Sequence, residues 1–113
     1  MTQEAVPHDP QAAVEYMLKT APRFAKAKAQ RLYLEEYRKT KKALLMREST
    51  GKAVADREAY AYSHPDYIEL LEGLRVAIEA EETFRFRLKA AELHVEIWRS
   101  KEASNRAEGR ATQ

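Results

Sequence analysis

The stretch that decides the fold is Tyr67–Trp98, with the sequence YIELLEGLRVAIEAEETFRFRLKAAELHVEIW. Apolar residues recur in it at alternating steps of three and four, and Glu81 is the one interruption. This spacing places them on one side of an α-helix, as in the heptads of coiled coils. We call this side the heptad seam: Tyr67, Leu70, Leu74, Ala77, Glu81, Phe84, Leu88, Ala91, Val95 and Trp98. It predicts a long helix over about 66–103 that packs against another helix, in parallel or antiparallel.

A second long helix is predicted over about 22–48, where nothing breaks helicity between Pro22 and Gly51. Its apolar stripe comprises Ala25, Ala29, Leu32, Tyr33, Tyr37, Ala43 and Leu44. Short helices are expected over about 10–21, with Asp9 as its N-cap, and over about 52–62. The fold class is therefore all-α, with the two long helices paired as a hairpin or coiled coil.

The domain organisation follows from the same pattern. We expect a disordered N-terminus over residues 1–8, a single helical domain over 9–103, and a flexible C-terminal tail over 104–113. The tail is polar and contains Ser, Asn, Gly and Arg, which is typical of a fraying end.

Charge is sorted along the chain, although the net charge is only +2. Residues 22–52 hold ten Lys or Arg against three carboxylates, whereas residues 66–98 hold four against eight. A basic helix with interleaved aromatic residues favours contact with a polyanion. The predicted nucleic-acid-binding residues are Lys28, Arg31, Arg38, Lys39, Lys41, Lys42 and Arg47.

Tyr33 and Tyr37 are four residues apart and share one helix face. Unpaired bases could stack on such rings, but tyrosines that line a helix–helix contact are commoner, so the pattern favours the core. The basic residues also have an alternative interpretation, as a solvated helix face paired with glutamates or docked on an acidic helix.

The heptad seam predicts self-association. The expected oligomer interface comprises Tyr67, Leu70, Leu74, Phe84, Leu88, Val95 and Trp98. Glu81, as a polar member of the seam, would specify register or oligomer number. A second stripe, Phe86, Ala90, Leu93 and Ile97, indicates a further neighbour for the C-terminal half of this helix.

No residue pattern indicates an enzyme. The three His residues accompany no nucleophile motif, no Gly-rich phosphate loop is present, and His64 and His94 lack the glutamate three residues earlier that di-iron bundles use. We therefore predict no catalytic residues, no metal and no cofactor. The absence of Cys and of any long apolar run predicts a soluble, cytoplasmic protein without a membrane partner.

The layout resembles the UvsY family of phage recombination mediators. The similarity covers residues 24–108: a Lys/Arg-rich helix that ends in a Ser/Gly turn (Lys41 to Gly51), a later helix of apolar heptads, and a polar tail with Arg106 and Glu108. The resemblance implies a helical oligomer that binds single-stranded DNA and helps load a RecA-like recombinase onto strands covered by single-strand binding protein. Lys42 matches a DNA-contacting lysine of that family, whereas Leu44 stands where the family has arginine.

These observations predict a non-enzymatic, oligomeric single-stranded-DNA-binding accessory protein of phage type, in the host cytoplasm. The alternative is a helical protein–protein interaction module, an inhibitor or adaptor that binds no nucleic acid. A third possibility is an assembly protein that only multimerises through the heptad helix.

Overall fold

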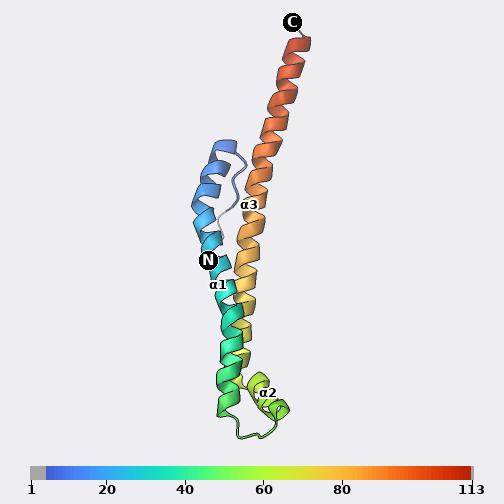
Figure 1. Cartoon of the computed structure of the whole chain (residues 1–113). Coiled ribbons are helices and arrows are strands. Elements are labelled where there is room, and N and C mark those ends of the chain that lie inside the picture. The colour runs from blue at the N-terminus through green and yellow to red at the C-terminus, as the bar shows by residue number, and fades with distance from the viewer. Residues whose placement is uncertain (1–4, 113) are drawn as a thin grey trace. The chain divides into compact units, whose positions relative to one another are not determined.

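The protein is all-α, as predicted: all regular structure among residues 5–112, which the computed structural model describes, is helical. Helix α1 spans Pro10–Glu48, α2 spans Val54–Ser63 and α3 spans Pro65–Ala111 (Figure 1). Figure 1 shows α2 between the end of α1 and the start of α3. Both long helices outrun their predicted bounds, because α1 absorbs the short helix expected over 10–21 and α3 continues past residue 103.

Pro22 does not separate two helices but lies inside α1. Proline removes one backbone hydrogen bond from a helix interior, and this loss is tolerable where water can reach the freed carbonyl. Pro22 is exposed, as is Leu18 four residues earlier. Buried Tyr16 and Thr20 precede the proline and half-buried Phe24 follows it at helical spacing, so packing on both sides holds the helix together.

Replacing Pro22 by Ala should therefore stabilise the fold. The alanine amide can donate the missing hydrogen bond, and we expect the free energy of unfolding to rise by about 2 kcal/mol. Urea titration followed by circular dichroism measures the change. A decrease in stability on this substitution would contradict a continuous α1.

The ends of the helices follow local chemistry. The Asp9 carboxylate accepts a hydrogen bond from the Ala12 amide at 2.9 Å, which confirms the predicted N-cap of α1. After α1, Gly51 has an ordinary negative φ, so it is not a left-handed helix cap. Its need for glycine is spatial: a Cβ atom there would lie 2.8 Å from Cβ of Asp56 in α2.

The described chain divides into two compact units, where the sequence predicted one domain over 9–103. The first unit comprises the chain up to Phe24 together with Thr83 onward, and the second comprises Ala25–Glu82. Residues 1–4, half of the N-terminus predicted to be disordered, and residue 113 lie outside the described residues.

In the first unit, the beginning of α1 packs on α3. Ala13, Tyr16 and Ala91 form a buried cluster, against which Val6, Met17 and Val95 pack. The Nε atom of Arg87 donates a hydrogen bond to the Tyr16 hydroxyl at 2.6 Å, which joins the two helices by a polar contact beside the cluster. Residues 5–8 carry no helix, and Val6 and Pro7 are half-buried on this unit.

In the second unit, the end of α1 packs on α2 and the start of α3. Leu45 of α1, Ala61 of α2 and Tyr67 of α3 form its buried cluster, with Met46 beside them. Leu74 and Ala77 are also buried. All three helices therefore contribute to one small core in this unit.

The heptad seam is covered within the chain, which corrects the predicted oligomer interface. Tyr67, Leu74, Ala77, Glu81 and Ala91 are all less than one-tenth exposed. Leu70, Phe84, Leu88 and Val95 are half-buried, and of the predicted interface residues Trp98 alone is exposed. The physical reason is that α1 of the same chain provides the opposing heptad stripe, so a second copy is not needed to cover the seam.

Candidate nucleic-acid interface

The predicted apolar stripe of α1 faces outward, and a partly basic stripe faces inward. Ala25, Ala29, Leu32, Tyr33, Ala43 and Leu44 are exposed, against expectation. The residues of α1 that are buried or half-buried at heptad spacing are instead Ala13, Tyr16, Thr20, Phe24, Ala27, Arg31, Leu34, Arg38, Lys41 and Leu45. Three of these are basic, and this placement divides the predicted nucleic-acid-binding residues into two groups.

Arg31 belongs to the inward group. Its Nε and Nη2 atoms both donate to the Glu81 carboxylate, the latter at 3.1 Å, and Nη1 donates to Glu35 at 3.0 Å. The Glu81 hydrogen bonds, followed by those to Glu35, raise the pKa of Arg31 above its ordinary value. The guanidinium is therefore held inside the second unit, so Arg31 is not part of a polyanion surface.

Lys41 and Lys42 are also engaged within the chain. Nζ of Lys41 lies 3.7 Å from the Asp66 carboxylate, and Nζ of Lys42 lies 3.6 Å from that of Glu58. Lys42 also lies over the Tyr62 ring, 4.7 Å from its centroid. Hydrogen bonding to Tyr62, and then the Glu58 charge, raises the pKa of Lys42 above its ordinary value. These contacts fasten α1 to α2 and α3, which corrects the assignment of both lysines to the nucleic-acid surface.

The remaining predicted cations divide between the inward stripe and the exposed side of α1. Lys28 and Arg47 are exposed, and Arg38 is half-buried on the inward stripe. Lys39 lies 3.4 Å from Glu36, with both side chains at least 70% exposed. An exposed pair of this kind is weak, because water and salt screen it. Lys39 can therefore exchange Glu36 for another anion.

Tyr33 is one of the residues whose exposure the sequence pattern predicted wrongly. The prediction favoured the core, but Tyr33 is 62% exposed. Its ring stacks on that of Tyr37, with centroids 5.9 Å apart and planes 8° from parallel. Lys26 lies on the same side of α1, because seven residues make about two helical turns. One residue in the sequence, Glu81, could have indicated this exposure. A carboxylate on the heptad seam requires a basic partner, so the basic stripe of α1 must face α3 and Tyr33 must face outward.

We define the α1 outer surface by the exposed cations and the two stacked tyrosines of the second unit: Lys26, Lys28, Tyr33, Tyr37, Lys39 and Arg47. Lys26 was not among the predicted binding residues. A flat aromatic pair beside Lys26 can stack a base, while the exposed cations of the helix hold neighbouring phosphates.

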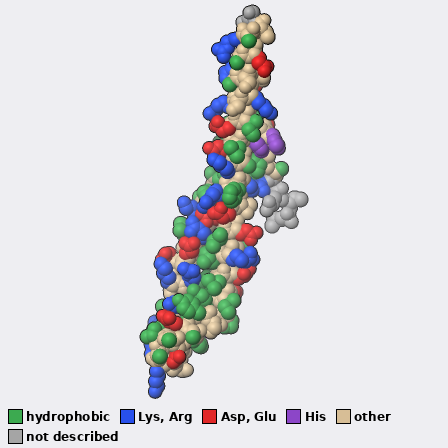
Figure 2. All heavy atoms as spheres, turned by 90° about the vertical axis from the view of Figure 1, so that its right-hand side faces the viewer, with side chains coloured by type: hydrophobic (Ala, Val, Ile, Leu, Met, Phe, Trp, Pro, Cys, Tyr) green, Lys and Arg blue, Asp and Glu red, His purple; other side chains and the backbone are tan. Residues whose placement is uncertain are grey.

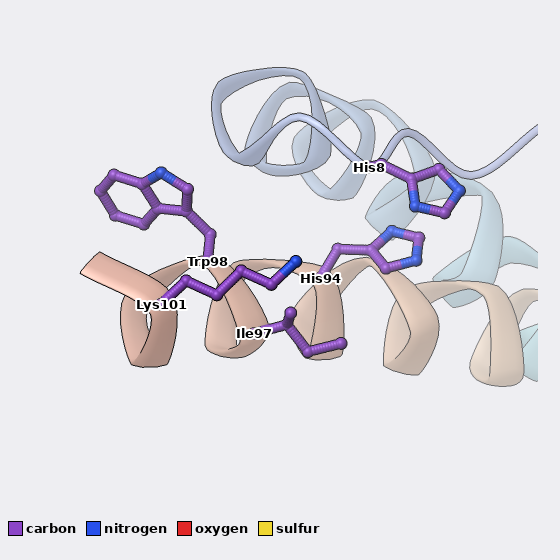
Figure 3. A pocket seen from close by; sticks show the side chains of 5 residues that line it. All are labelled: His8, His94, Ile97, Trp98 and Lys101. Atoms are coloured by element: carbon purple, nitrogen blue, oxygen red, sulfur yellow. The ribbon is translucent and has the colours of Figure 1, made fainter. Parts of the chain in front are cut away.

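A small hollow lies beside His8 and His94, but it is not an enclosed pocket for a small molecule. This hollow, of about 190 Å³, is lined by His8, His94, Ile97, Trp98 and Lys101 (Figure 3). His8 stacks on His94 at a centroid distance of 4.2 Å, and Nδ1 of His94 lies 2.6 Å from the Pro7 carbonyl oxygen. The volume is below the roughly 300 Å³ typical of small-molecule sites. These contacts fasten the N-terminal segment to α3.

Two features are absent among the described residues, namely a cluster of metal ligands and a membrane-spanning helix. Among residues 5–112, no three His, Asp or Glu side chains gather closely enough to hold a metal ion. Across the same residues, no helix combines the length and the apolar character that a bilayer crossing requires.

Comparisons with models of known protein families, with curated proteins and with solved structures return no match for this chain.

Proposed function

We propose that this protein is a non-enzymatic accessory protein that binds single-stranded DNA through the α1 outer surface. The observation that supports this proposal is the parallel Tyr33–Tyr37 stack, whose Tyr33 ring is 62% exposed, on a helix with several exposed lysines. A soluble fold gains little from exposing a tyrosine ring that could be buried. An exposed ring between cations is useful where a planar, anionic polymer is the ligand.

The chemistry of such a surface matches single strands better than duplexes. Splayed bases can stack on Tyr33, whereas bases inside a duplex are already stacked on each other. Lys26, Lys28, Lys39 and Arg47 would contact phosphates without reading sequence. On the face that Figure 2 displays, blue and red side chains are interspersed and no uniformly basic area is seen.

The role of the bound strand is inferred from the resemblance to the UvsY family. A mediator of that type would act together with a RecA-like recombinase on strands covered by single-strand binding protein. Several copies would bind the same strand at once, so that weak individual contacts combine into tight overall binding. Such a protein would need no cofactor of its own.

The proposal is tested by fluorescence anisotropy of a labelled oligo-dT strand and of a duplex of equal length. We expect the single strand to bind more tightly, and its affinity to fall steeply as salt rises, because phosphate contacts release counterions. Equal binding of strand and duplex, or binding indifferent to salt, would contradict the proposal.

A second candidate function is a protein–protein interaction module without nucleic-acid binding. It is favoured by the number of large apolar side chains left exposed, including Leu18 at 72% and Phe86 at 67%. Exposed apolar patches mark docking surfaces for other proteins. In this case, the anisotropy experiment would detect no binding to either nucleic acid.

A further inference from the structure

The C-terminal half of α3 exposes an apolar stripe on the side turned away from the heptad seam. The stripe consists of Phe86, Ala90, Leu93 and Ile97, spaced by four, three and four residues. Phe86 is 67% exposed, Leu93 48% and Ile97 52%. Three large apolar side chains in a row, each between 48% and 67% exposed, mark an unpartnered helix face.

The side chains that border this stripe differ between its two edges. On one edge, Arg87 donates to the Tyr16 hydroxyl and His94 contacts the Pro7 carbonyl, so both are engaged within the first unit. On the other edge, Lys89 and Glu96 are exposed. Glu96 forms a surface contact with Arg99, at 3.4 Å, which is a weak pair.

Lys89 and Glu96 are seven residues apart, equivalent positions in successive heptads. In an antiparallel pair of helices, residues of this edge face the same edge of the partner. Lys89 of each copy would then lie beside Glu96 of the other, which gives two symmetric ion pairs. The stripe is thus complementary in charge to a second copy of itself.

The apolar residues fit the same arrangement. Antiparallel pairing places Ala90 opposite Leu93 and Phe86 opposite Ile97, so the one small residue of the stripe meets a large one. Parallel pairing would place Ala90 opposite Ala90 and leave a gap, and it would place Lys89 near His94 instead of a carboxylate. A two-fold antiparallel contact is also closed, so association stops at the dimer.

We propose that this protein self-associates through an antiparallel contact of the α3 stripe Phe86, Ala90, Leu93 and Ile97, bordered by Lys89–Glu96 ion pairs between the copies. The residues of this contact belong to the first unit, whereas those of the α1 outer surface belong to the second. It replaces the predicted heptad interface, and it stands independently of nucleic-acid binding.

The test is the mass of the full chain by sedimentation equilibrium over a range of concentrations. We expect a monomer–dimer equilibrium for the unchanged protein. Leu93→Glu should raise the dissociation constant of the dimer at least about tenfold, because each copy loses buried apolar area. Leu18→Glu is the matched control: it places the same charge at an exposed leucine of α1 and should leave the dissociation constant unchanged.

The charge pairs test the orientation without touching the apolar residues. Lys89→Glu alone and Glu96→Lys alone should each weaken association, because each creates like-charged neighbours across the contact. The double variant should regain the affinity of the unchanged protein, and an equal mixture of the two single variants should form a mixed dimer. A monomer at all concentrations would overturn the proposal, as would single charge variants that associate normally or are not rescued by each other.

Discussion

Replacing Arg31 by Met should lower the midpoint of thermal unfolding by more than about 10 °C. Glu81 is 1% exposed, and the substitution removes two hydrogen bonds from its carboxylate. Water cannot reach the buried carboxylate to replace the hydrogen bonds that the guanidinium donated. Methionine keeps much of the length and apolar stem of Arg31, so the effect reports the charge and not a cavity.

Replacing the other partner of the pair, by Glu81→Gln, should lower the midpoint of thermal unfolding by less than Arg31→Met does. The Arg31 side chain is 21% exposed and can recruit water when the charge of Glu81 is removed. Glu35→Gln is the matched control, because Glu35 binds the same guanidinium from a 38% exposed position and its loss should shift the midpoint only slightly. Similar small shifts for Arg31→Met and Glu35→Gln would show that the Arg31–Glu81 pair does not hold the helices together.

The Arg31→Met variant should also respond to pH in a defined direction. Removal of the guanidinium takes away a positive charge that favours the ionised form of the Glu81 carboxylate, so the pKa of this group in the folded variant rises relative to the unchanged protein. Stability tied to such a group is present at low pH and is lost as pH rises. The deficit of the variant relative to the unchanged protein should therefore shrink between neutral pH and about pH 4.

Replacing Tyr33 by Ala should weaken the binding of oligo-dT about 5- to 150-fold. This range corresponds to about 1–3 kcal/mol for one base stacked on an aromatic ring. The stability of the fold should barely change, since the ring is 62% exposed. Anisotropy titrations at constant salt give the affinity, and thermal unfolding confirms the fold.

Two variants accompany this measurement. Tyr33→Phe keeps the stacking face and should bind nearly as well as the unchanged protein. Tyr60→Ala removes another exposed tyrosine, from α2, and should leave the affinity unchanged. If Tyr33→Ala binds as well as Tyr60→Ala, the stacked tyrosines are not the platform for the bases.

The sequence was sufficient to predict the helices but not their pairing. The heptad seam of α3 is visible because nine of its ten members are apolar. The opposing stripe of α1 includes Arg31, Arg38 and Lys41, and hydropathy assigns such residues to solvent. The apolar pattern therefore selected the wrong face of α1, and the seam was assigned to a second copy.

For the candidate site, the sequence showed which helix is rich in cations but not which of these cations are exposed. The density of lysine and arginine correctly identified α1 as the basic helix, but density does not show which cations meet a carboxylate from elsewhere in the chain. Asp66 and Glu58 lie 25 and 16 residues from their lysine partners, so local pattern could not pair them. The prediction that a helix ends before Pro22 was also wrong. Packing on both sides of Pro22 keeps α1 continuous, although proline disfavours a helix interior.

The proposal of an outward-facing nucleic-acid surface on α1 is tested by comparing two pairs of lysines. The pairs differ in placement and are identical in charge. Lys26→Gln with Lys28→Gln alters the α1 outer surface, whereas Lys41→Gln with Lys42→Gln alters lysines already paired within the chain. For oligo-dT, the slope of log affinity against log salt should flatten by about 1.4 in the first variant, from two lost phosphate contacts, and should not change in the second. A slope that changes in the Lys41/Lys42 variant and not in the Lys26/Lys28 variant would contradict an outward-facing nucleic-acid surface on α1.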